Sequence, residues 1–219
     1  MQYADSAYPA GGFAQSWGLE TAVTEGDVHD TASLAEACRS LLSHQAGCTD
    51  AVAAAACNRL AGGELDAITL VDRRLSATRA AREPRLASLR MGRRLIETAA
   101  DAEADPWLWA LLAAVRGGET PGNHACMLGV VAGRLGLVAA DAAVLALWTI
   151  ANGLVSAAVR LLPVTHDEVQ AMLAELRPLI AQLANRASRL DPMQMAGSAP
   201  QFDIWAMQHE TATVRLFAS

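Results

Sequence analysis

Apolar residues recur at helical spacing along most of this chain. After Thr165 they follow one another at steps of three and four residues, at Val169, Met172, Leu173, Leu176, Ile180 and Leu183, which places them on one face of a helix. We find no run of β-branched residues with the period-two alternation of a half-buried strand. The pattern therefore predicts an all-α, single-domain helical bundle of about seven to nine helices.

Capping signals divide this pattern into separate helices. Ser33 with Glu36 and Thr165 with Glu168 have the spacing of a capping box, in which a hydroxyl and a carboxylate satisfy free backbone N–H groups. They predict helices from Ser33 to about residue 46 and from Thr165 onward, with a kink or local break at Pro178. Caps, glycines and prolines predict further helices from Thr49 or Asp50 to the Gly62-Gly63 pair, over residues 66–81 and 84–102, from Pro106, over residues 120–135, and from Asp141.

The stretch Ala142–Val159 has no charged residue over eighteen positions, so its length raises the question of a membrane span. It is marginally short for that role. It also contains Thr149, Asn152 and Ser156, and small residues dominate it. We favour a buried central helix and expect no membrane association.

Composition limits the function further. The chain has 219 residues, of which 53% are hydrophobic and 18% charged, which is typical of a folded protein with one substantial core. Glycine and proline do not gather into a linker, so residues 1–219 are expected to form one domain. The net charge of −6 argues against nucleic-acid binding.

All seventeen basic residues are arginine, and the sequence has no lysine. A P-loop needs a lysine for the nucleotide phosphates, and Schiff-base catalysis needs a lysine amine. The chain is therefore not expected to hydrolyse nucleotides through a Walker A motif of its own.

Cysteine and histidine give little sign of a metal site. The four cysteines never form a CxxC pair and are typical of apolar core residues in a reducing, cytoplasmic compartment, and no secretory signal precedes them. His44 with Cys48, and His124 with Cys126, are the closest pairs of ligand type, but neither has a third ligand nearby in sequence. We expect no tight metal site and no cofactor.

Eight arginines fall within residues 73–94: Arg73, Arg74, Arg79, Arg82, Arg85, Arg90, Arg93 and Arg94. The first interpretation is a solvated face paired with carboxylates. The second is a docking face for an acidic partner, which would be weakened by salt. Nucleic-acid binding comes third, because no aromatic residues are interspersed among these arginines.

The C-terminal segment is unusually apolar for a chain end. Residues 199–219 include Phe202, Ile204, Trp205, Met207, Leu216 and Phe217, with His209, Glu210 and Arg215 among them. A free terminus is normally polar, so this segment is expected to be buried against its own domain or in a partner.

The N-terminal segment completes a family pattern. Residues 5–20 read Asp-Ser-x-x-Pro-x-Gly-Gly-Phe-x-x-Ser-x-Gly-Leu-Glu, and the tail runs from Pro200 through His209-Glu210 to Arg215-Leu216-Phe217-x-Ser219. Matches to Arg85-x-x-Ser88 with Gly92-Arg93, to His124 with Gly129, and to Ser156-x-x-Val159-Arg160-Leu161 fall between them in order. Together these motifs resemble the urease accessory protein family UreF over the whole chain. Members of that family usually have a longer leading helix, so residues are expected to precede Met1.

The resemblance implies a cytoplasmic all-α homodimer that acts in urease maturation and is not an enzyme. Such proteins bind a second accessory protein, UreD (also called UreH), and together recruit the GTPase UreG, which drives nickel insertion into apo-urease. A variant of this hypothesis is that the chain modulates GTP hydrolysis by its partner. The alternatives are a nickel-binding metallochaperone, another all-α protein-interaction module, or an enzyme, for which the sequence shows no converging base and nucleophile.

The resemblance also implies which residues contact partners. It assigns GTPase recruitment to Phe13 and Arg215, and it implies that the segment 198–219 is ordered by its partner. The full expected set is Pro9, Gly11, Gly12, Phe13, Ser16, Glu20, His209, Glu210, Arg215, Leu216 and Phe217. The alternatives are that Phe13 is a core residue and that Arg215 pairs with Glu210 on the same turn. Gln15 stands where many members have histidine, which leaves a metal or proton role there open.

Overall fold

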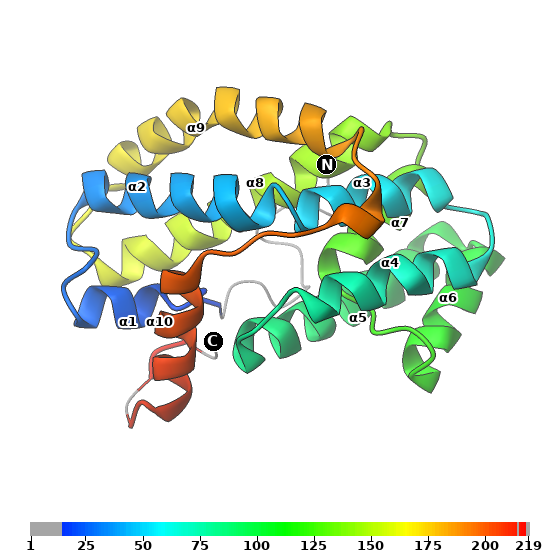
Figure 1. Cartoon of the computed structure of the whole chain (residues 1–219), viewed down its shortest axis with the longest axis horizontal. Helices are drawn as coiled ribbons and strands as arrows, with labels where there is room; N and C mark the ends of the chain where they lie inside the picture. Colours follow the sequence, from blue (N-terminus) through cyan, green and yellow to red (C-terminus); the bar gives the residue numbers. More distant parts are fainter. Residues whose placement is uncertain (1–14, 214, 218–219) are drawn as a thin grey trace.

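The computed structural model describes residues 15–213 and 215–217, and within them it is all-α, as predicted (Figure 1). No described residue lies in a strand. The elements are α1 (Leu19–Thr24), α2 (Thr31–Leu41), the π-helical turn η3 (Leu42–Ala46), α3 (Asp50–Leu60), α4 (Leu65–Ala77), α5 (Arg82–Glu103), α6 (Pro106–Gly117), α7 (His124–Arg134), α8 (Ala139–Leu161), α9 (His166–Ala187), the 3₁₀ turn η4 (Pro192–Gln194) and α10 (Pro200–Thr211).

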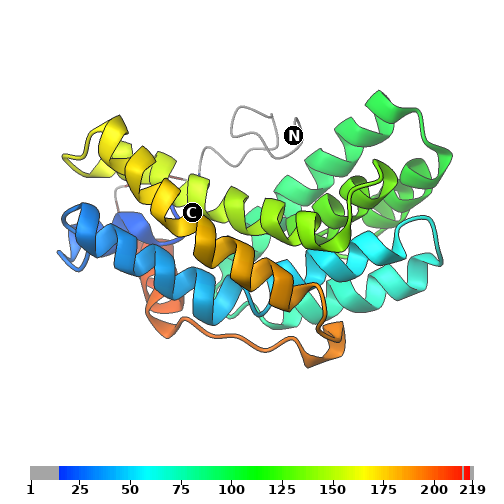
Figure 2. The same ribbon diagram turned by 90° about the horizontal axis from the view of Figure 1, so that it is seen from above.

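Helix α3 lies at the centre of the packing. Every residue from Asp50 to Asn58 is buried, so this alanine-rich helix is covered all round. Its main neighbours are α7 and α8, while α9 packs along α2 and α8, and Figure 2 shows α2 and α9 side by side. A helix without a polar face cannot stand at a surface, so α3 fixes where its neighbours lie.

Two glycines let α7 approach α3 closely. A Cβ added at Gly129 would collide with the backbone carbonyl of Ala54, and one at Gly133 would lie 2.5 Å from the carbonyl oxygen of Asn58. The two glycines are four residues apart and share one face of α7. The backbones of α3 and α7 therefore meet directly, with no large side chain between them.

Helix α8 contains the uncharged stretch. It is the one helix of the described chain that is long and apolar enough to cross a membrane, but 56% of its most apolar window is buried within the protein. It packs on α3, α7 and α9. The environment is that of the buried central helix expected from the sequence.

Two of the predicted helix signals behave differently in the structure. Asp30, rather than Ser33, caps α2: its carboxylate accepts the Ser33 N–H at 2.8 Å, and Ser33 Oγ accepts the Asp30 N–H at 3.1 Å. The prediction of a Ser33–Glu36 box was therefore wrong by one helical turn. The Thr165–Glu168 box forms as predicted, and α9 continues without a break through Pro178.

The segment before α7 is held by a distant carboxylate. Asp72, which is fully buried on α4, accepts hydrogen bonds from Thr120 Oγ1 (2.8 Å), the Gly122 N–H (2.5 Å) and the Asn123 N–H (3.0 Å). These groups would otherwise be free donors at the helix start. As a result α7 begins at His124 and not at Thr120, where the sequence pattern placed it.

We expect Gly129→Ala to destabilise the protein by about 1–3 kcal/mol, because the added methyl group must push α7 away from α3. The measurement is urea unfolding followed by circular dichroism. Gly153→Ala on α8 is the matched control, since its Cβ would meet only Trp17 Nε1 at 3.7 Å. This control should be neutral or more stable by up to about 1 kcal/mol. Equal effects of the two substitutions would contradict the close approach.

Candidate partner-binding site at the chain ends

The two ends of the described chain meet on one side of the molecule, where α1 packs against α10 (Figure 1). Gly18 makes this contact possible. A Cβ there would lie 2.9 Å from the Ala206 nitrogen and 3.0 Å from Trp205 Cβ, and its φ of +82° is one that glycine adopts without strain. The described part of the N-terminal motif, residues 15–20, therefore lies beside the C-terminal helix α10.

Helix α10 buries one face against its own chain. Phe202, Trp205 and His209 are at most 5% exposed. The rings of Phe202 and Trp205 meet edge to face, with centroids 5.0 Å apart, and Trp205 Nε1 donates to Asp27 Oδ2 at 2.9 Å. The apolar tail was expected to be buried either against its own domain or in a partner. For this face of α10, the first expectation is correct.

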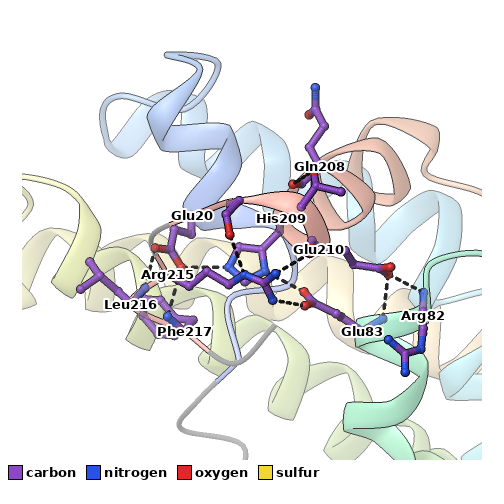
Figure 3. Close-up of polar contacts among 11 residues, drawn as sticks. Glu20, Arg82, Glu83, Gln208, His209, Glu210, Arg215, Leu216 and Phe217 are labelled. Atoms are coloured by element: carbon purple, nitrogen blue, oxygen red, sulfur yellow. Dashed lines mark hydrogen bonds and ion pairs between the residues drawn. The ribbon is translucent and has the colours of Figure 1, made fainter.

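His209 links three helices through its two ring nitrogens (Figure 3). Nε2 lies 3.0 Å from Glu20 Oε2 on α1, and Nδ1 lies 2.6 Å from Glu83 Oε2 on α5. Carboxylates only accept hydrogen bonds, so both nitrogens donate only when the ring carries two protons. The His209 ring therefore lies between two carboxylates, with its side chain only 1% exposed.

Arg215 is held by the same carboxylate. Its Nη1 donates to Glu83 Oε1 at 2.8 Å, and its Nη2 and Nε donate to the backbone carbonyls of Glu210 and Ala212. The expected alternative, a pair with the Glu210 carboxylate, is not what the structure has. That carboxylate instead accepts the N–H groups of Arg82 (3.0 Å) and Glu83 and so caps α5.

Glu20 fixes the end of the tail. Its two oxygens accept the Leu216 N–H at 2.7 Å and the Phe217 N–H at 3.1 Å. Burial raises the pKa of the Glu20 carboxyl, but the Leu216 N–H, the His209 ring and the Phe217 N–H outweigh it, so the pKa lies below its ordinary value of 4.5. The carboxylate form is therefore the one that holds the tail.

The tail presents a different set of side chains to solvent. Phe217 is buried, with the Arg160 guanidinium 4.4 Å from its ring centroid. By contrast, Leu216 is 68% exposed, Ile204 48% and Met207 45%. Ile204 and Met207 are three residues apart on α10, so they lie on one exposed face of that helix.

The structure brings together most, but not all, of the residues expected at this site. Glu20, His209, Glu210, Arg215, Leu216 and Phe217 form one network, and Ser16 is buried next to α1. Pro9, Gly11, Gly12 and Phe13 lie outside the described residues. Sequence reasoning missed Glu83 and Asp27, because an isolated carboxylate in a stretch of arginines has no motif of its own.

The candidate metal ligands do not converge. Among the described residues, no group of three or more His, Cys, Asp or Glu side chains could hold a metal ion. Cys48 Sγ is 3.3 Å from Arg186 Nη2. Burial lowers the pKa of His124 to about 4, and burial raises that of Cys126, which lies beside Cys57.

The fold and this site define an all-α protein in which an N-terminal motif and a C-terminal tail form a common surface. The family model named UreF matches residues 28–177. The chain is 32% identical over 219 residues to the urease accessory protein UreF of Photorhabdus laumondii, covering 100% of this chain and 96% of the relative. It is 36% identical to the protein of that name from Cereibacter sphaeroides, covering 99% and 95%. The chain belongs to the UreF family.

We expect His209→Ala to lower the free energy of unfolding by about 1–3 kcal/mol, because two largely buried carboxylates, those of Glu20 and Glu83, each lose one hydrogen-bond partner. It should also speed amide exchange at Leu216 and Phe217. Urea unfolding and hydrogen exchange measure the two effects. His166→Ala, at an exposed position of α9, should change stability by less than about 0.5 kcal/mol. If both variants retain the stability and exchange rates of the unmodified protein, His209 does not hold the tail.

Tail docking should weaken in acid. Because the pKa of Glu20 is lowered when the tail is docked, its contribution is fully present above the ordinary carboxyl pKa of 4.5 and is lost as the pH falls through the lowered value. The measurement is the protection of the Leu216 and Phe217 amides against exchange as a function of pH. Glu20→Gln should flatten this dependence, and Glu175→Gln, at an exposed position of α9, should not. The same pH dependence in Glu20→Gln would contradict the assignment.

Proposed function

We propose that this chain is an adaptor in urease maturation, which joins a UreD/UreH-type accessory protein and recruits a UreG-type GTPase to apo-urease for nickel insertion. The observation that carries the proposal is the junction of the two family motifs. There, Arg215 is held by Glu83 and the surrounding carbonyls while its side chain stays 36% exposed. An arginine fixed in this way loses little conformational entropy when a partner binds it.

The proposal has the chain act as a cytoplasmic homodimer whose single domain spans residues 1–219. In this proposal, the segment 198–219 becomes fully ordered when a partner covers Ile204, Met207 and Leu216. Phe13, together with Pro9, Gly11 and Gly12, would extend the same surface. The absence of lysine supports a division of labour, since nucleotide chemistry would then belong to the GTPase.

The test is size-exclusion chromatography with light scattering on the chain mixed with its cognate UreD-type partner and GTPase. The full chain should elute in a complex based on a dimer. A version that ends before Ser198 should not join this complex. Arg215→Ala, which keeps α10, should lose the GTPase while retaining the accessory protein.

Arg177→Ala is the control for this test, because Arg177 is exposed on α9, away from the junction. It should assemble as the unmodified chain does. No complex under any nucleotide or nickel condition would overturn the adaptor proposal. If the complex forms but the GTP turnover of the partner stays the same at saturating chain, the chain recruits the GTPase without modulating its rate.

A further inference from the structure

A line of basic side chains runs along the outer face of α5. Arg82, Arg90, Arg93 and Arg94 are exposed, and the spacing of the first three puts them on one side of the helix. The opposite side of α5, with Ala87, Met91 and Leu95, is buried in the core. We refer to these four arginines, together with Arg116 of the adjoining helix α6, as the α5 basic stripe.

The chain neutralises little of this stripe. Arg90 and Arg93 have no hydrogen-bond or ion-pair partner among residues 15–213 and 215–217. Glu97 serves both Arg94 and Arg116, so one carboxylate faces two guanidinium groups. Five positive charges thus stand against the carboxylates of Glu97 and of Glu210, which lies 3.0 Å from the Arg82 nitrogen, in a protein whose net charge is −6.

Other arginines of the same sequence cluster are engaged within the protein. Arg79 pairs with Asp50 in the interior at 2.5 Å, while Arg73, Arg74 and Arg85 donate to backbone carbonyls. The prediction of a face paired with carboxylates therefore fails for the stripe itself, because Glu97 is the one carboxylate that pairs with it in the described part of the chain.

Two further features describe what the stripe could bind. Leu86 and Leu89 are half-buried between Arg82 and Arg90, so apolar surface alternates with charge. The stripe also begins at Arg82, whose N–H is capped by Glu210 of the tail. It is therefore continuous with the surface that presents Arg215.

We propose that the α5 basic stripe docks an acidic, leucine-bearing segment of a partner protein. The carboxylates of that segment pair with Arg90, Arg93 and Arg94, and its apolar side chains cover Leu86 and Leu89. Charge complementarity selects this occupant, since the protein is acidic elsewhere and repels acidic chains except here. Residues 82–94 include no aromatic side chain on which nucleic-acid bases could stack. The proposal does not depend on the adaptor function.

The test is fluorescence anisotropy with a labelled synthetic peptide that carries glutamate and leucine at alternating helical turns. Binding to the full chain should weaken about tenfold in the double variant Arg90→Glu/Arg93→Glu and fall as salt rises. The matched control is Arg39→Glu/Arg177→Glu, which makes the same charge change at exposed positions on α2 and α9. This control should bind the peptide as the unmodified chain does, apart from a small loss of affinity caused by its more negative net charge.

Other outcomes would overturn the proposal. Equal weakening in the two double variants would show a general effect of net charge. If a labelled oligo-dT of equal charge binds as tightly as the peptide, the stripe is a nucleic-acid surface. If the oligomeric state changes in Arg90→Glu/Arg93→Glu alone, the stripe is a contact between copies of this chain. Peptide binding is measured without urease partners, so a failed adaptor complex and a failed stripe remain distinguishable.

Discussion

The direct backbone contact between α3 and α7 is the constraint on which the rest of the structure depends. Alanines on α3 and glycines on α7 remove the side chains that normally separate two helices, so the pair packs as one rigid unit. α8 covers this unit from another side. Because α5 packs on α7, the outer helix that carries Glu83 and the α5 basic stripe takes its position from this contact.

The chain ends then meet on that rigid frame through charge. Two carboxylates, Glu20 and Glu83, face one guanidinium and one imidazole, and each carboxylate serves the tail in two ways. Glu20 holds both the His209 ring and the tail backbone, while Glu83 holds both His209 and Arg215. Such shared acceptors couple the contacts of the network, since each carboxylate holds two parts of the tail at once. Glu210 adds a cap on α5, so the tail and the basic stripe are joined through one helix end.

Much of this could be predicted from local sequence. The three- and four-residue spacing identified α9, the Thr165–Glu168 box identified its start, and Pro106 identified the start of α6. The misplaced start of α7 has a cause outside its own segment. Asp72 reaches fifty positions along the chain to hold Gly122, and thereby moves the start of α7. A helix start that is stabilised by a distant side chain leaves no signal in its own window.

By itself, the sequence determined the all-α class, most of the helices, the resemblance to the UreF family and six residues of the junction. These depend on periodicity, capping chemistry and residue order, which are local properties of the chain. Only the tertiary structure decided that residues 15–20 lie beside the C-terminal tail, that Glu83 joins α5 to the tail, and which arginines are exposed without a partner among the described residues. The physical reason is that the meeting of Glu20, Glu83 and Arg215 depends on contacts between segments far apart in the chain, such as the close approach of α1 and α10 at Gly18, which no local window of the sequence shows.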